Sequence, residues 1–172
     1  LTLISLIKGL ISLGHEIIKP VPSLFSFDLE APFLLKCAGI SLDNVFCSFS
    51  ISGKKFEDKG KILITHKGLS GPLILRLSAF AARELNEVNY QTRIQVNWAS
   101  EQPEIVKEKL RNYRYCYAKA SIGGSHVFKN YPKRFWLSLI QQAQINPNIR
   151  WAELTKYQEN KNEKSYNIPE QG

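Results

Sequence analysis

The sequence predicts an α+β protein, in which a small antiparallel β-barrel or sheet with one long helix is followed by a helical subdomain. Three observations lead to this prediction. Short segments of alternating polar and apolar residues recur through the first part of the chain. Among them lies a single long segment, 71–86, in which apolar residues recur at helical spacing. Further along, helical spacing replaces the alternation. We therefore expect a β-rich subdomain at 16–100, a helical subdomain at 101–158 and a polar tail at 159–172.

We expect residues 1–15 to be the end of a helix that belongs to a parent domain. The apolar run from Leu1 to Leu13 contains Lys8 and stops at Gly14, and a glycine with positive φ often terminates a helix. A helix that spans a bilayer needs about 20 apolar residues, and a signal peptide starts with basic residues. The run therefore predicts neither a membrane partner nor a signal peptide. The sequence contains no methionine, from which we expect a fragment or a processed product.

The alternating segments predict five strands. We expect them at 16–19, 23–30, 45–52, 61–65 and 92–98. The third is the clearest, because Cys47 and Phe49 would share one face while Ser48 and Ser50 would share the other. Gly53 is expected to turn the chain after it. In the second part of the chain, helical spacing predicts helices at 104–113, 132–144 and 151–158.

The long helix at 71–86 is expected to begin directly after a short loop. Ser70 is placed to cap this helix, and Pro72 suits its first turn. The first turn of a helix presents unpaired backbone N–H groups, which can hold an anion or a carbonyl oxygen. Gly68 and Gly71 would allow a ligand or another backbone segment to approach the loop closely.

Two polar side chains add chemistry to the same loop. His66 brings a titratable group and Lys67 brings a cation. The segment lacks the residue spacing of a Walker loop, of a dinucleotide-binding loop and of a nucleophile elbow. On residue chemistry alone, an ordinary strand-to-helix connection is the more frequent structure, because helix caps are far commoner than anion sites. A ligand site is the alternative hypothesis.

The formal net charge of +8 permits an anionic partner such as nucleic acid, a phosphate-bearing cofactor or an acidic domain face. In the C-terminal part, cations interleave with aromatic residues, a combination that binds single-stranded nucleic acids. The cations are Arg111, Arg114, Lys119, Lys129, Lys133 and Arg134, and the rings are Tyr113, Tyr115, Tyr117, Phe128 and Tyr131. Aromatic residues at helical spacing more often belong to a core, so a nucleic-acid-binding module is an alternative that we do not favour. A structural domain with no activity of its own is a further alternative.

The three cysteines, Cys37, Cys47 and Cys116, are odd in number and widely spaced. No CxxC pattern and no cysteine–histidine spacing predicts a metal site, and nothing in the sequence predicts a disulfide framework. We therefore expect reduced and mostly buried thiols in a cytoplasmic protein.

The stretch from Gly60 to Ser78 reads GKILITHKGLSGPLILRLS. It resembles the signature GxLLFTHxGLSGPxxLxLS of the BaiN-like flavoproteins, which are FAD-dependent oxidoreductases also described as NAD(P)/FAD-dependent or aminoacetone-oxidase-like enzymes. Four flanking segments resemble family segments in the same order: SLGH, PSLFSFDLEAPF, AGISLDNV and NYPKRFWLSLIQQAQI. The resemblance extends over nearly the whole chain, to about Lys156.

This resemblance implies an insert domain placed between two halves of an FAD-binding Rossmann-type domain, where it covers the flavin and shapes the substrate pocket. The implied partners are that FAD-binding domain of the same parent chain and a small-molecule substrate. The GxGxxG motif and the C-terminal glycine-rich segment that hold FAD in the family do not occur in this sequence. We therefore expect FAD in the intact parent protein, and neither bound FAD nor activity in this segment alone.

The resemblance also changes the interpretation of the loop. His66 becomes the candidate catalytic residue, as a proton donor or a hydrogen-bond partner. Lys67, Gly68, Ser70 and Gly71 become candidate cofactor-binding residues at the start of the helix, where they would face the flavin or the substrate. No metal-binding residue is predicted.

Overall fold

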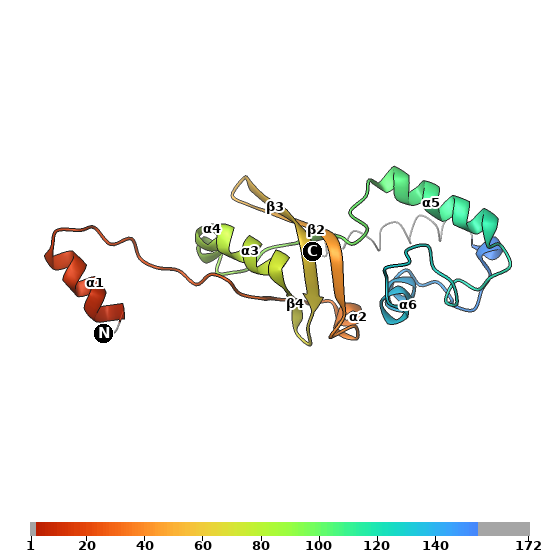
Figure 1. The fold of residues 1–172 in the computed structure, drawn as a ribbon, viewed down its shortest axis with the longest axis horizontal. Helices are drawn as coiled ribbons and strands as arrows, with labels where there is room; N and C mark the ends of the chain where they lie inside the picture. The colour runs from red at the N-terminus through yellow and green to blue at the C-terminus, as the bar shows by residue number, and fades with distance from the viewer. Residues whose placement is uncertain (1–2, 155–172) are drawn as a thin grey trace.

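The computed structural model describes residues 3–154 and confirms the predicted α+β fold (Figure 1). Its centre is an antiparallel sheet with the strand order β1-β4-β3-β2-β5. The strands are β1 (Phe27–Asp28), β2 (Ser41–Ile51), β3 (Lys54–Ile64), β4 (Gly68–Ser70) and β5 (Gln95–Asn97). The helices are α1 (Leu3–Ser12), α2 (Pro32–Leu35), α3 (Pro72–Phe80), α4 (Ala82–Glu87), α5 (Pro103–Cys116) and α6 (Lys133–Gln142), with a 3-10 turn at Trp151–Glu153. The sheet is not closed into a barrel, because its edge strands β1 and β5 do not pair with each other.

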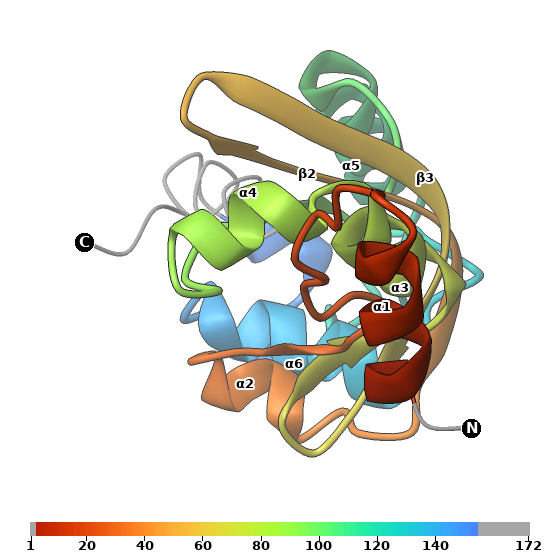
Figure 2. The ribbon, with the colours of Figure 1, turned by 90° about the vertical axis from the view of Figure 1, so that its left-hand side faces the viewer.

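The β2–β3 hairpin supplies most of the sheet. A two-residue turn at Ser52 and Gly53, both with positive φ (50° and 80°), joins the strands and sets Ile51 opposite Lys54. Turns of this kind match the twist of a hairpin. β3 therefore begins at Lys54 rather than at the predicted position 61, and from Lys55 onward exposed residues alternate with inward-facing ones along the strand. In the end-on view of Figure 2, the hairpin curves around α3.

α3 covers the inner face of this hairpin. Leu73, Ile74 and Leu77 of α3 are buried in the same core as Ile62 and Ile64 of β3. The apolar positions of the helix recur at helical spacing, so they share one face and that face packs on the sheet. The packing places the start of α3 next to the ends of β3 and β4.

The single helix predicted at 71–86 is in fact two helices. The backbone bends at Ala81 (φ −98°, ψ 14°), which ends α3 and precedes α4. The Ala81 N–H still donates to the Leu77 carbonyl at 3.0 Å, so α4 continues almost directly from α3. Bends of this kind usually occur at proline or glycine. Neither residue is present here, so the sequence carried no signal for the bend.

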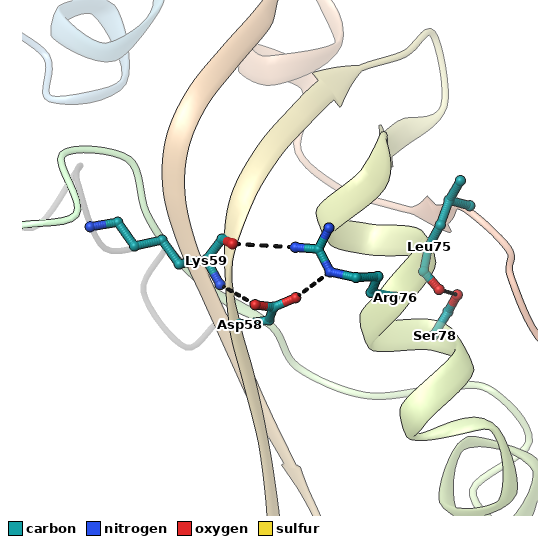
Figure 3. A network of polar contacts seen from close by, with 5 residues as sticks. All are labelled: Asp58, Lys59, Leu75, Arg76 and Ser78. Carbon is teal, nitrogen blue, oxygen red and sulfur yellow. Dashed lines mark hydrogen bonds and ion pairs between the residues drawn. The ribbon is translucent and has the colours of Figure 1, made fainter.

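An ion pair ties α3 to β3 (Figure 3). The Arg76 guanidinium donates to the Asp58 carboxylate (Nε–Oδ2 2.8 Å) and to the Lys59 carbonyl (3.3 Å). Burial alone would raise the pKa of Asp58, but the hydrogen bonds from Arg76 and from the Lys59 N–H, together with the Arg76 charge, lower that pKa overall. Gly60 leaves room for the guanidinium, because a Cβ at this position would lie 2.9 Å from Arg76 Nη2.

The segment before β1 differs from its prediction. α1 confirms the expected N-terminal helix, and Gly14 follows it with a φ of 86°. The strand expected at 16–19 is wrong, because no strand among residues 3–154 lies beside this segment to pair with it. The strand expected at 23–30 is reduced to β1, which pairs with β4 only at Phe27 and Asp28. Figure 1 shows α1 at the end of this extended connection, apart from the sheet.

No helix in the range 3–154 combines the length and the apolar character that a bilayer span requires.

The helical part shares a continuous core with the sheet. Trp98, which follows β5, packs edge-on against Phe135 of α6, with 5.1 Å between ring centroids. α6 also meets α2, where Arg134 donates to the Ala38 carbonyl at 2.7 Å. α2 was not predicted, because its four residues are too few for a helical repeat to be visible in the sequence.

The helices expected at 104–113 and 132–144 are confirmed as α5 and α6. The helix expected at 151–158 is a single 3-10 turn as far as the structure describes it, and the indole of Trp151 fills the core between the helices. The remainder of that segment and the predicted tail at 159–172 lie outside the described residues.

Candidate functional site

The loop between β3 and β4 is a tight turn that Thr65 holds together. The Thr65 N–H donates to the Gly68 carbonyl (2.8 Å), and Thr65 Oγ1 accepts hydrogen bonds from the N–H groups of Lys67 (3.3 Å) and Gly68 (3.0 Å). Threonine hydroxyls often stabilise turns in this way. His66 and Lys67 form the tip of the turn, and both are exposed. Contacts within the chain therefore set the shape of the loop and direct these two residues outward.

Both loop glycines lie against the backbone of this chain. A Cβ at Gly68 would lie 2.0 Å from the Phe27 carbonyl oxygen of β1. Gly71 has a φ of 95°, and a Cβ there would lie 2.9 Å from the Leu63 nitrogen of β3. Of the two alternatives considered for these glycines, close approach of a ligand or of another backbone segment, the structure shows the second. Gly68 is buried as a result.

The predicted capping role of Ser70 is wrong. The residue that precedes α3 is Gly71, and no side chain caps the helix. Ser70 belongs to β4, where it pairs with Leu63, and its Oγ accepts a hydrogen bond from Ser26 Oγ at 2.7 Å. Ser70 is therefore engaged in strand pairing and does not cap α3. Pro72 occupies the first turn of α3, as predicted.

The arrangement brings three polar side chains to the surface at one end of the sheet. His66 and Lys67 sit at the turn, and Ser70 follows within three residues, half-buried beside the start of α3. The imidazole can donate or accept a hydrogen bond, the ammonium can pair with an anion, and the Ser70 hydroxyl retains its own proton for donation. Such a set can contact the polar edge of a flat ligand.

Sequence reasoning missed a second surface feature. A mostly apolar groove of about 460 Å³ lies between β1 and the segment that leads into β5. We call it the edge groove; its lining includes Phe25, Phe27, Asp28, Tyr90, Thr92 and Ile94. These residues come from two segments that are distant in the sequence, and neither segment contains a recognised motif. The alternation of Phe25 and Phe27 was the only visible signal, and it predicted a core strand.

The rings of the basic C-terminal part lie mainly in the core. Phe128 and Tyr131 are buried, and Tyr113 packs against Trp151 with 5.2 Å between ring centroids. Tyr115 is 89% exposed and Tyr117 is 52% exposed. The structure therefore leaves two of the five aromatic side chains open for stacking with a base.

In the described part of the chain, no group of three or more histidine, cysteine or acidic residues is arranged to hold a metal ion. Cys37 and Cys47 are buried and Cys116 is exposed, and all three are free, which confirms mostly buried thiols. Burial raises the pKa of Cys47 to about 12, with a smaller contribution from the Asp58 carboxylate. Its thiol is therefore not a nucleophile at neutral pH.

The sequence profile of a family described as "HI0933-like protein barrel and H2TH domain" matches residues 21–162. The match begins in the connection after α1 and takes in the whole sheet and helices α2 to α6. No curated protein matches the chain.

Proposed function

Since the chain belongs to the family of HI0933-like proteins, we propose that it is the substrate-side insert domain of an FAD-dependent oxidoreductase. In this role the domain covers the flavin held by another domain of the same parent protein and forms part of the pocket for a small-molecule substrate. The matched profile covers a barrel and H2TH domain, which is consistent with such an insert. The reaction then belongs to the assembled parent protein.

The observation that carries the proposal is the exposed turn at His66 and Lys67. Its backbone is fixed by Thr65 and by close contact of Gly68 with β1, yet its two polar side chains point away from the core. A rigid loop with outward polar groups is the arrangement that a preorganised contact to a ligand needs. Neither side chain contributes to the buried core, so neither is required for packing and both are free to contact a ligand.

The residues of the loop fit contact with one edge of a flavin. A bound flavin supplies the electron or hydride transfer. Lys67 would favour negative charge nearby, Ser70 would donate a hydrogen bond, and His66 would give or take a proton at the substrate. Gly68 and Gly71 lie against backbone and would act by positioning the loop. The diphosphate and ribose of FAD would be held by the partner domain.

The test uses the intact parent protein with its flavin. We expect His66→Ala to lower kcat about 100-fold, the usual contribution of a positioned acid or base, and Lys67→Ala to shift the flavin absorbance bands. Both side chains are exposed, so the midpoint of thermal unfolding should stay unchanged. Lys59→Ala, which removes an exposed cation from β3, is the matched control for the lysine. Unchanged turnover and an unchanged flavin spectrum in both loop variants would remove the assignment.

A further inference from the structure

The edge groove lies at the open side of the sheet. β1 and β5 are the two edge strands, and the groove runs between β1 and the segment 90–94 that leads into β5. Its volume of about 460 Å³ falls within the range that small-molecule sites occupy in proteins, about 300–1,000 Å³. The groove is mostly apolar, and an apolar ligand would remove this surface from water.

One wall of the groove is aromatic and held in place. Phe25 packs edge-on against Tyr90 and Phe27, with ring centroids 5.4 Å and 5.9 Å apart. The Phe25 N–H donates to Ser78 Oγ of α3 at 3.0 Å, and Phe27 pairs with Leu69 of β4. The wall is therefore tied both to the helix and to the sheet, so a ligand would meet a preformed surface.

The opposite wall depends on an uncommon backbone conformation. Asn89 and Tyr90 have positive φ values of 52° and 61°, a conformation that asparagine often adopts and that is costly for a bulky residue such as tyrosine. Two contacts hold this turn: the Tyr90 N–H donates to the Leu85 carbonyl at 2.7 Å, and the Tyr90 hydroxyl donates to Asn86 Oδ1 at 3.0 Å. Together they direct the Tyr90 ring back onto Phe25 at the groove.

Among the described residues that line the groove, the only charged one is Asp28. Asp28 is exposed beside Phe27, and no cation within residues 3–154 forms an ion pair with it. The protein as a whole carries a formal net charge of +8, so the long-range field favours anions. Selection of a cation by this groove would therefore have to come from Asp28 itself.

We propose that the edge groove binds a small organic cation with an apolar ring, with the ring against Phe25 and Tyr90 and the cationic group beside Asp28. Aromatic side chains pack edge-on or offset against a ring. The carboxylate adds a direct ionic contact that an anion of the same shape lacks. Affinity comes from the apolar walls, and the preference for positive charge comes from Asp28.

This site does not depend on the proposed oxidoreductase role. β1 separates the groove from the His66 loop, since one edge of β1 pairs with β4 and the groove lies along the other side. The test therefore uses this chain alone, without flavin, and its result does not decide the function of the loop.

The probe is 2-phenylethylammonium, compared with phenylacetate and 2-phenylethanol, which keep the ring and change the charge. In titrations followed by amide NMR shifts, we expect the cation to bind at millimolar concentrations, to shift Phe25, Tyr90 and Ile94, and to bind about fivefold more tightly than phenylacetate. Asp28→Asn should weaken binding of the cation about threefold and leave 2-phenylethanol unchanged. Asp43→Asn, an exposed carboxylate of β2, is the matched control.

Three outcomes would overturn the proposal. They are equal affinity for 2-phenylethylammonium and phenylacetate, resonance shifts that lie outside the groove, and a loss on Asp28→Asn no larger than that on Asp43→Asn. Asp28 is exposed, so its substitution leaves the fold intact. Tyr90→Leu separates the contribution of the apolar wall from that of the Asp28 charge. It should weaken binding of all three probes by a similar factor, because each loses its contact with the Tyr90 ring.

Discussion

Replacement of Gly68 by alanine tests whether the signature loop is shaped by contacts inside the chain. The added Cβ would lie 2.0 Å from the Phe27 carbonyl oxygen, 2.8 Å from the Leu29 nitrogen and 3.0 Å from the Asp28 Cα. All three atoms belong to backbone, so no side chain can move aside to make room. β1 would have to retreat from β4 by more than about 1 Å to restore normal contact distances.

The cost follows from what this retreat breaks. The Leu29 N–H donates to the Lys67 carbonyl at 2.8 Å, and Phe27 pairs with Leu69. Loss of about two such hydrogen bonds costs about 2 kcal/mol. Partial exposure of the buried Phe27 side chain adds about 1–2 kcal/mol. We therefore expect Gly68→Ala to lower the free energy of unfolding by about 3–4 kcal/mol.

Urea unfolding followed by tryptophan fluorescence measures this change. Two control variants separate the clash from other effects of the same substitution. Gly39→Ala adds a side chain at a φ of 87° with open space around it, so it should cost only about 1–2 kcal/mol of backbone strain. Gly9→Ala, in α1 with nothing within 4 Å, should be neutral or slightly stabilising. If Gly68→Ala costs no more than Gly39→Ala, the reasoning fails.

Two further predictions concern single side chains. The pKa of Asp58 is lowered in the folded state, so its contribution to stability is present above its ordinary pKa of 3.8 and is lost as the pH falls through the lower folded value. Asp58→Asn should therefore lower the free energy of unfolding by about 0.5 kcal/mol at pH 7 and make unfolding less sensitive to acid. An equal loss of unfolding free energy at pH 2.5 would contradict this. A thiol reagent at pH 8 should label the exposed Cys116 rapidly and should reach Cys37 and Cys47 only after unfolding. Mass spectrometry of the labelled peptides measures the three labelling rates, and equal rates would be inconsistent with the structure.

The parts of the fold that the sequence predicted well depend on patterns within a single element. The alternation at 45–52 predicted a buried face, and Cys47 and Phe49 are buried in β2. Helical spacing predicted α5 and α6 because each buries one face along its own length. Such patterns show which face of an element is buried, so they can be recognised without knowing which segment packs against that face.

The errors occur where a neighbour decides the structure. The segment 16–19 has residues that suit a strand, but no second strand from the described part of the chain lies beside it. Ser70 suits a cap, but pairing of β4 with β3 holds it in the strand, two residues before the helix starts at Pro72. Periodicity within one segment could not predict either result, because each depends on how other segments of the chain are placed in the fold. The edge groove was missed for the same reason.

The signature loop contains two kinds of residue, and only one of them bears on function. Thr65, Gly68 and Gly71 are explained by the turn and by backbone packing, so any protein with this turn against β1 and β3 would need similar residues, whatever it binds. His66 and Lys67 are exposed and contribute nothing to that packing. A match over the whole loop is therefore strong support for the fold and much weaker support for a reaction. The oxidoreductase proposal depends on these two side chains, which is why substitutions there are more informative than further matches to the glycines.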